Sequence, residues 1–67
     1  MKHLRKYRIV KPDIFGNVTS IKQGYAELKD AKRYLEELGN EYLYLQVMEV
    51  GEYKLTKNGK AKKIVKY

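Results

Sequence analysis

Residue types that could perform catalysis or bind a metal are few and scattered in this chain of 67 residues. It has one histidine, eight Asp and Glu residues and no cysteine. His3 lies near the N-terminus, where we expect it to be solvated and to lack a partner that would orient it as a base. Glu36 and Glu37 are consecutive in a predicted helix and therefore point in different directions. We predict no catalytic residue, no cofactor and no metal site, and we expect that the protein is not an enzyme.

The strongest chemical signal is a group of tyrosines and lysines in the C-terminal half. The sequence has seven tyrosines, one phenylalanine and no tryptophan. Within residues 41–50, tyrosines and a methionine alternate with Leu43, Leu45 and Val47, so the two sets lie on opposite faces of a strand. If a helix covers the leucine face, the tyrosine face is left to bind a partner; alternatively, these rings only suit a half-exposed sheet. The candidate partner-binding residues are Tyr42, Tyr44, Met48, Lys54, Lys63 and Tyr67.

Charge is segregated along the chain. The formal net charge is +7, from 15 Lys and Arg and 8 Asp and Glu. Residues 1–12 and 53–67 contain no acid, whereas residues 13–52 contain all eight. Two basic segments side by side in one sheet would attract nucleic-acid phosphates, whereas lysines on edge strands would prevent aggregation. The candidate nucleic-acid-binding residues are Arg5, Arg8, Lys54, Lys60, Lys62 and Lys63.

The N-terminal half predicts two strands and a helix. Residues 4–10 are rich in strand-forming types, and residues 18–21 are expected to return antiparallel to them after a loop. Residues 28–38 carry apolar side chains at spacings of three and four, which predicts an amphipathic helix. Gly39 is placed to end this helix in the left-handed conformation, whereas Glu27 is a weak N-cap.

The C-terminal half predicts one strand that continues past a bulge or bend at Gly51 and a second strand that returns after a turn. Apolar groups on both faces of residues 41–50 are typical of a central strand, with Gly51 as a bulge or bend after it. Asn58-Gly59 predicts a two-residue type I′ turn between residues 53–57 and 60–67. This register would place Lys54 opposite Lys63 and Tyr53 opposite Ile64.

These elements predict a single α+β domain over residues 1–67, ordered ββαββ, with a single helix packed on one face of an antiparallel sheet. A chain of this length buries only about 60% of its unfolded surface, which excludes a large enclosed cavity. No apolar run reaches the ~18 residues of a membrane span, so we expect a cytoplasmic protein with no membrane partner. The predicted core residues are Ile9, Ile21, Leu28, Ala31, Leu35, Leu38, Leu43, Leu45, Val47, Leu55 and Ile64.

Two consecutive segments carry a resemblance to a group of known proteins. The run LKDAKRYLEEL at residues 28–38, followed by YLYLQVMEV at residues 42–50, resembles the helix-then-strand pattern of small phage and prophage proteins of Gram-positive bacteria. Such proteins are often host-takeover or anti-defence factors that bind host proteins or nucleic acids. The resemblance implies a binding function and assigns no role to any residue.

Three hypotheses of function follow. We rank first a non-enzymatic binding protein that docks on a host or partner protein as an accessory factor or inhibitor, because no nucleic-acid recognition motif accompanies the charge. The alternative is a sequence-nonspecific nucleic-acid-binding module that uses the basic terminal strands and exposed tyrosines. A third hypothesis is a homodimer that buries its tyrosine faces or pairs its edge strands.

Overall fold

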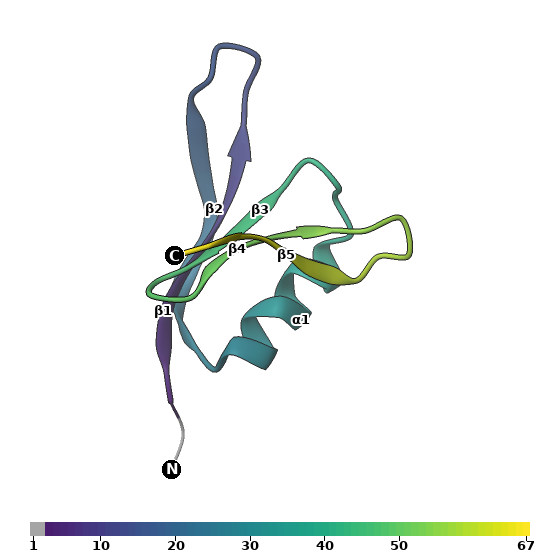
Figure 1. Ribbon diagram of the computed structural model, residues 1–67. Coiled ribbons are helices and arrows are strands. Elements are labelled where there is room, and N and C mark those ends of the chain that lie inside the picture. The colour runs from purple at the N-terminus through teal and green to yellow at the C-terminus, as the bar shows by residue number, and fades with distance from the viewer. Residues whose placement is uncertain (1–2) are drawn as a thin grey trace.

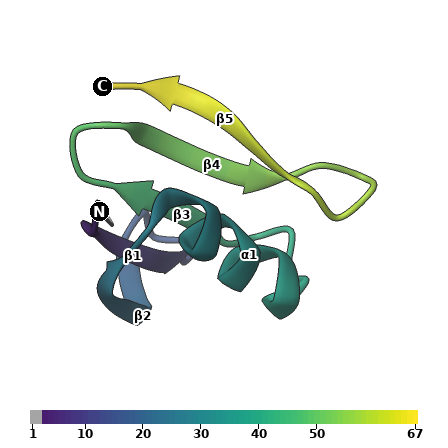
Figure 2. The same cartoon turned by 90° about the horizontal axis from the view of Figure 1, so that it is seen from below.

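The computed structural model describes residues 3–67 as one helix packed on one face of an antiparallel sheet (Figures 1 and 2). The elements are β1 (Arg5–Pro12), β2 (Val18–Ala26), α1 (Leu28–Leu38), β3 (Tyr44–Val47), β4 (Gly51–Leu55) and β5 (Ala61–Lys66). The five strands of this part of the chain lie in the order β2-β1-β3-β4-β5. The predicted α+β class is confirmed, but the order ββαββ is wrong, because three strands follow the helix instead of two.

The additional strand arises because the chain reverses direction between Val47 and Gly51, where only a bulge or bend at Gly51 was predicted. The Val50 amide donates a hydrogen bond to the Val47 carbonyl oxygen at 3.1 Å, which closes a turn between β3 and β4. Glu49 occupies the left-handed region of this turn, with φ 68°. Glycine or asparagine usually occupies such a position, so the glutamate gave no turn signal.

The β4–β5 hairpin forms where Asn58-Gly59 predicted it, but with a different turn. The Gly59 amide donates to the Thr56 carbonyl oxygen at 2.9 Å, and the Thr56 amide donates to the Lys60 carbonyl oxygen at 2.8 Å. Gly59 has φ 78°, whereas Asn58 is not in the positive region, so the turn is not type I′. Three residues instead of two lie between the paired Thr56 and Lys60, as in a type I turn followed by a glycine bulge.

This longer turn shifts the predicted register. Lys54 pairs with Lys62 instead of Lys63, and Tyr53 pairs with Lys63 instead of Ile64. A bulge between Glu52 and Tyr53 then returns the rest of the strands to the predicted alignment, with Glu52 opposite Val65. The predicted pairing of Lys54 with Lys63 is therefore wrong.

The β1–β2 hairpin is longer than predicted, and its far half leaves the body of the molecule (Figure 1). The two strands are antiparallel, as expected, with a bulge at Ile21. On its other side, β1 pairs with β3 only over Tyr7–Val10. Beyond Val10 the hairpin is therefore a two-stranded ribbon, and Val18 and Ile21 on β2 are exposed.

The helix has the predicted bounds and ends as predicted. Gly39 adopts φ 64°, and its amide donates to the Leu35 carbonyl oxygen at 3.3 Å. Glu27 stands at the N-cap without a side-chain hydrogen bond to the first turn, as expected from its type. At eleven residues, α1 is too short to cross a membrane, and no other segment of residues 3–67 forms a helix that could.

The core lies between α1 and the sheet. Its buried members are Tyr7, Ile9, Ala26, Ala31, Leu35, Leu43, Leu45, Val47 and Tyr53. Leu28 and Leu55 are only partly buried at its margin. Ile21, Leu38 and Ile64 were predicted to be buried but are 47%, 48% and 47% exposed, so these predictions are wrong.

The residues wrongly predicted to be buried lie where the helix does not cover the sheet or where the strand register differs from the predicted one. Ile21 is the extra residue of the β2 bulge, and Ile64 lies at the β4–β5 bulge, opposite no residue of β4. Tyr53 takes the core position instead, because it lies directly across from Leu45.

The two basic segments are not neighbours. β1 lies in the interior of the sheet and β5 forms an edge, with β3 and β4 between them (Figure 2). Lys62, Lys63 and Lys66 lie on this β5 edge, whereas β2, the opposite edge, has only Lys22. The lysines of β5 thus stand where they protect an edge from pairing with another chain.

Candidate binding face

The sheet face opposite the helix carries the candidate site, and we call it the open face. Arg8 alternates with the core residues Tyr7 and Ile9, so it points away from α1. Arg8 pairs with Gln46, Gln46 pairs with Glu52, and residues directly opposite each other share a face. By the same pairing the open face comprises Lys6, Arg8, the buried Val10, Gln23, Tyr25, Tyr44, Gln46, Met48, Glu52, Lys54, Lys62, Val65 and Tyr67.

A row of polar contacts crosses the middle of the open face. Arg8 donates from Nε and Nη2 to Oε1 of Gln46, at 3.1 and 2.6 Å. One strand further, the Tyr67 hydroxyl donates to Oε2 of Glu52 at 2.8 Å. Both pairs join residues that are far apart in sequence. They orient side chains from β1, β3, β4 and the residue that follows β5.

The environment of Tyr67 favours its neutral form. Partial burial raises the pKa of its hydroxyl, and both the hydrogen bond to Glu52 and the charge of that carboxylate raise it further. The Arg8 guanidinium opposes this effect and lowers the pKa of Tyr67, but the net direction is upward. Tyr67 therefore remains a hydrogen-bond donor, and it is still 55% exposed to a partner.

A pocket of about 290 Å³ lies beside this row. Its walls combine cationic, amide, thioether and phenol groups from β1, β2, the β3–β4 turn and the C-terminal end. The residues around it are Lys6, Tyr7, Arg8, Gln23, Gln46, Met48 and Tyr67. Such a mixture can hold a side chain that presents both an apolar body and a carboxylate or carbonyl group.

A second contact lies nearer the other end of the open face. The Lys54 ammonium stands over the ring of Tyr44, 5.1 Å from its centroid. Lys62 pairs with Lys54 on the neighbouring strand, so a second cation lies beside this one on the open face. The ring of Tyr44 is thus partly covered, which leaves less of its surface for stacking.

Four of the six predicted partner-binding residues meet on the open face. These are Tyr44, Met48, Lys54 and Tyr67. Tyr42 is 66% exposed but precedes β3, where its amide is held by Oδ1 of Asn40 at 2.9 Å. It lines separate hollows beside the β4–β5 turn.

Lys63 is the other predicted residue that lies elsewhere. It pairs with Tyr53, which belongs to the core, and its ammonium lies 5.7 Å from the Tyr53 ring centroid. Lys63 therefore belongs to the helix side of the sheet, because the turn of the β4–β5 hairpin shifts the register by one residue.

The predicted nucleic-acid-binding residues divide between the two faces. Arg8, Lys54 and Lys62 lie on the open face. Arg5 pairs with Ala26 on the core side and approaches Glu49 at 3.9 Å, and Lys60 belongs to the β4–β5 turn. The six cations therefore do not form one surface.

Sequence reasoning did not select Lys6, Gln23, Gln46 or Glu52 for the site. Lys6 and Gln46 could have been found from alternation, because each lies two residues from another open-face residue on its strand. Gln23 required the long β2 strand, and Glu52 required the turn between β3 and β4, neither of which has a local sequence signal.

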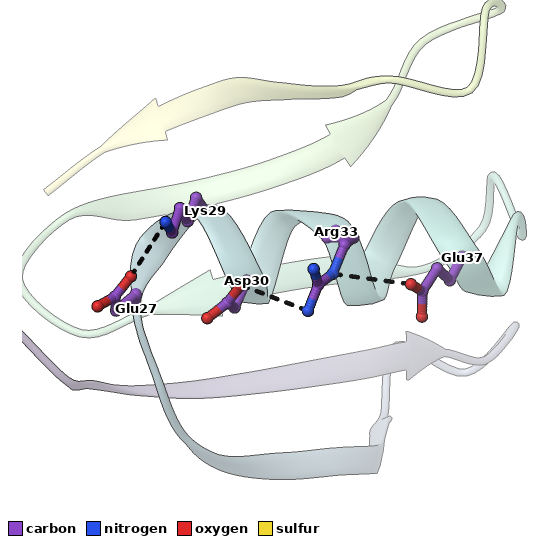
Figure 3. A network of polar contacts seen from close by, with 5 residues as sticks. All are labelled: Glu27, Lys29, Asp30, Arg33 and Glu37. Atoms are coloured by element: carbon purple, nitrogen blue, oxygen red, sulfur yellow. Dashed lines mark ion pairs between the residues drawn. The ribbon is translucent and has the colours of Figure 1, made fainter. Parts of the chain in front are cut away.

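The outer surface of the helix differs from the open face because its charges are paired. Arg33 lies 3.4 Å from Asp30 and 3.7 Å from Glu37, and Lys29 lies 3.6 Å from Glu27 (Figure 3). The open face holds four cations and one carboxylate, which already accepts a hydrogen bond from Tyr67. Excess positive charge is thus found on the open face and not on α1.

Within residues 3–67, no group of three or more metal-ligating side chains lies together. The chain was compared with protein families, curated proteins and solved structures, and it matches none of them. The site must therefore be interpreted from its own geometry.

Proposed function

We propose that this chain is a non-enzymatic binding module that docks on a protein partner through the open face of its sheet. The polar row in the middle of this face supports the proposal. Arg8 and Gln46 form one fixed pair, Glu52 and Tyr67 form another, and Met48 lies beside them. Arginine, tyrosine and methionine are the types enriched at protein interfaces, and this row offers both donors and acceptors.

The charge around the row favours an acidic partner. Four cations surround one carboxylate on the open face, so an acidic protein surface would be steered toward it. A cytoplasmic accessory or inhibitory factor of a phage or prophage, acting on a host protein, is the role that we propose for such a module.

The test uses affinity capture from a lysate of a Gram-positive bacterium, with and without nuclease. Tyr67→Ala and Met48→Ala remove exposed groups of the open face, and Tyr42→Ala removes an equally exposed tyrosine outside it. We expect nuclease-resistant capture that the first two variants reduce at least about ten-fold and the third leaves unchanged. Capture that nuclease abolishes, or that all three variants affect equally, contradicts the proposal.

Nucleic-acid binding is the second candidate, because Arg8, Lys54 and Lys62 share a face with Tyr44. Glu52 stands in the middle of that face and would repel a phosphate backbone, which is why we rank this candidate lower. Binding of a fluorescent single-stranded oligonucleotide should then weaken by about 0.7 log units per log unit of salt for each phosphate contact. A flat response excludes this candidate, and molecular mass in solution tests the homodimer.

A further inference from the structure

The tip of the β1–β2 hairpin presents two apolar side chains to solvent. Ile14 is 93% exposed and Phe15 is 81% exposed, more than any other large apolar residue of the described chain. They are consecutive and lie in the turn between β1 and β2. The far end of this hairpin projects beyond the rest of the sheet (Figure 1). An isoleucine and a phenylalanine in water forgo the hydrophobic stabilisation that full burial would supply.

The turn that carries these two residues is held by Asp13. The Asp13 amide donates to the Asn17 carbonyl oxygen at 2.8 Å, and the Gly16 amide donates to the Asp13 carbonyl oxygen at 3.2 Å. Oδ1 of Asp13 accepts from the amides of Phe15 and Asn17 at 2.8 and 2.9 Å. Four hydrogen bonds thus fix the tip before any partner arrives, which lowers the entropy lost on binding.

The tip itself carries no cation that could bind an anionic surface. Residues 12–21 contain no Lys or Arg, although the whole chain has 15 in 67 residues. The only charged side chain in this segment is Asp13, which would be repelled by nucleic-acid phosphates and by anionic lipid headgroups. Lys11 and Lys22 lie just beyond the segment, nearer the body of the sheet.

Apolar surface continues from the tip along the ribbon. Val18 is 52% exposed and Ile21 is 47% exposed, and both lie on β2, the sheet edge with a single lysine. The ribbon therefore offers a narrow apolar end and side, bordered by two cations at its base.

We infer that the Ile14–Phe15 tip inserts into an apolar pocket of a protein partner, with a carboxylate at the rim of the pocket placed to meet Lys11. The inference rests on the proposed function, protein docking, but it uses a separate surface from the open face. Two rigid apolar anchors that enter a concave pocket are the usual centre of a protein interface.

The β4–β5 turn provides a matched control for substitutions in the β1–β2 tip. The turn at Thr56–Lys60 has the same backbone hydrogen bonds, and Oγ1 of Thr56 accepts from the amides of Asn58 and Lys60 as Asp13 does in the first turn. Lys57 and Asn58 stand where the first turn has its isoleucine and phenylalanine. Changes at equivalent positions of the two turns should be equally harmless to folding.

The experiment compares two double variants of the full chain, Ile14→Ser with Phe15→Ser and Lys57→Ser with Asn58→Ser. Each is used to capture proteins from nuclease-treated lysate of a Gram-positive bacterium, and a photoreactive benzophenone side chain at position 15 or 58 reports direct contact. We expect the tip variant to lose at least about ten-fold in capture, the control to capture as the wild type does, and cross-links to form from position 15 only.

Other outcomes overturn the inference in distinguishable ways. If a partner is captured but the tip variant binds it as well as the wild type does, the tip inference fails and the proposed function stands. If no nuclease-resistant partner is captured, both fail. Tip-dependent binding to vesicles of equal phosphatidylcholine and phosphatidylserine, to a duplex oligonucleotide, or to a second copy of the chain also overturns it.

Discussion

The β1–β2 and β4–β5 hairpins are closed by turns with the same backbone hydrogen bonds, yet the two hairpins differ in how the rest of the molecule holds them. In each turn the residue before the loop accepts two amides through its side chain, and a glycine has positive φ, 86° at Gly16 and 78° at Gly59. The β4–β5 hairpin is bonded to the helix, because the Ala61 amide donates to Oε2 of Glu36 at 2.8 Å.

The far half of the β1–β2 hairpin has no such support. Beyond Val10, β1 pairs with β2 alone, and the ribbon ends in exposed Ile14 and Phe15. A two-stranded ribbon in water is stable only through its base and its turn. The same turn geometry therefore closes a packed hairpin between β4 and β5 and presents apolar groups to solvent between β1 and β2.

The largest expected difference between the hairpins lies at their strand glycines. A Cβ at Gly51 would overlap the backbone carbonyl oxygen of Val65, whereas a Cβ at Gly24 would be in ordinary contact with the Tyr7 ring at 3.7 Å. We expect Gly51→Ala to lower the free energy of unfolding by about 3 kcal/mol. Gly24→Ala should cost about 1 kcal/mol, from backbone strain at φ 158°. Urea denaturation measures both, and equal losses would contradict the close approach of β4 and β5.

The second difference lies in the bond that ties β5 to the helix. Glu36→Ala leaves the Ala61 amide without its acceptor in a partly buried place, and should lower the free energy of unfolding by about 1.5–3 kcal/mol. Glu37→Ala is the matched control, because Glu37 makes an exposed ion pair with Arg33 that contributes about 0.5 kcal/mol or less. If thermal or urea unfolding shows the same loss for both variants, Glu36 does not anchor the hairpin.

The side chains that hold the two turns should differ less in their contribution to the free energy of unfolding. Asp13→Ala removes a carboxylate that accepts two amides at 2.8 and 2.9 Å, and we expect a loss of about 1–1.5 kcal/mol. Thr56→Ala removes a neutral hydroxyl that accepts two amides at 3.3 Å, and we expect about 0.5 kcal/mol. Urea denaturation and amide hydrogen exchange of the two turns check this order, and a larger loss at Thr56 would reverse it.

Alkaline pH should lower the stability of the folded chain through two tyrosines. Burial, and then the nearby Tyr34, raise the pKa of Tyr7 in β1, and partial burial together with Glu52 raises the pKa of Tyr67 after β5. Because both pKa values lie above the ordinary value of 10.0, the unfolded chain loses these protons more readily. The stabilisation is present below pH 10 and is lost as pH rises through the folded-state pKa values.

Two variants measure how much each tyrosine contributes to the loss of stability at alkaline pH. Unfolding midpoints followed above pH 10 should fall less steeply in Tyr7→Phe and in Tyr67→Phe than in the wild type. An unchanged slope in either variant would show that the corresponding tyrosine does not contribute to the loss.

The helix and the positions of both hairpin turns could be predicted because their signals are local. Apolar spacing defined residues 28–38, Gly39 supplied the left-handed end, and Asn58-Gly59 marked the β4–β5 turn. The β1–β2 turn lies where a loop was predicted, but it is tighter than expected. Each of these features depends on residues a few positions apart, so no knowledge of distant partners was needed.

The β3–β4 turn and the strand register could not be predicted. Glu49 holds a conformation that glutamate seldom adopts, and it does so because β3 and β4 pair on both sides of it. One extra residue in the β4–β5 turn moved Lys63 to the helix side and brought Lys62 beside Lys54. The sequence therefore predicted the residue types of the candidate site, but only four of the six predicted partner-binding residues lie in it.

The sequence by itself determined an α+β chain with one amphipathic helix, two basic segments and an excess of tyrosine over other aromatics. Only the tertiary structure decided that Tyr7 and Tyr53 belong to the core, and that the basic segments are separated by β3 and β4. It also placed Ile14 and Phe15 at the end of a free ribbon. The reason is that propensity and spacing act over a few residues, whereas strand pairing joins residues far apart and is settled by the packing of the whole sheet on its helix.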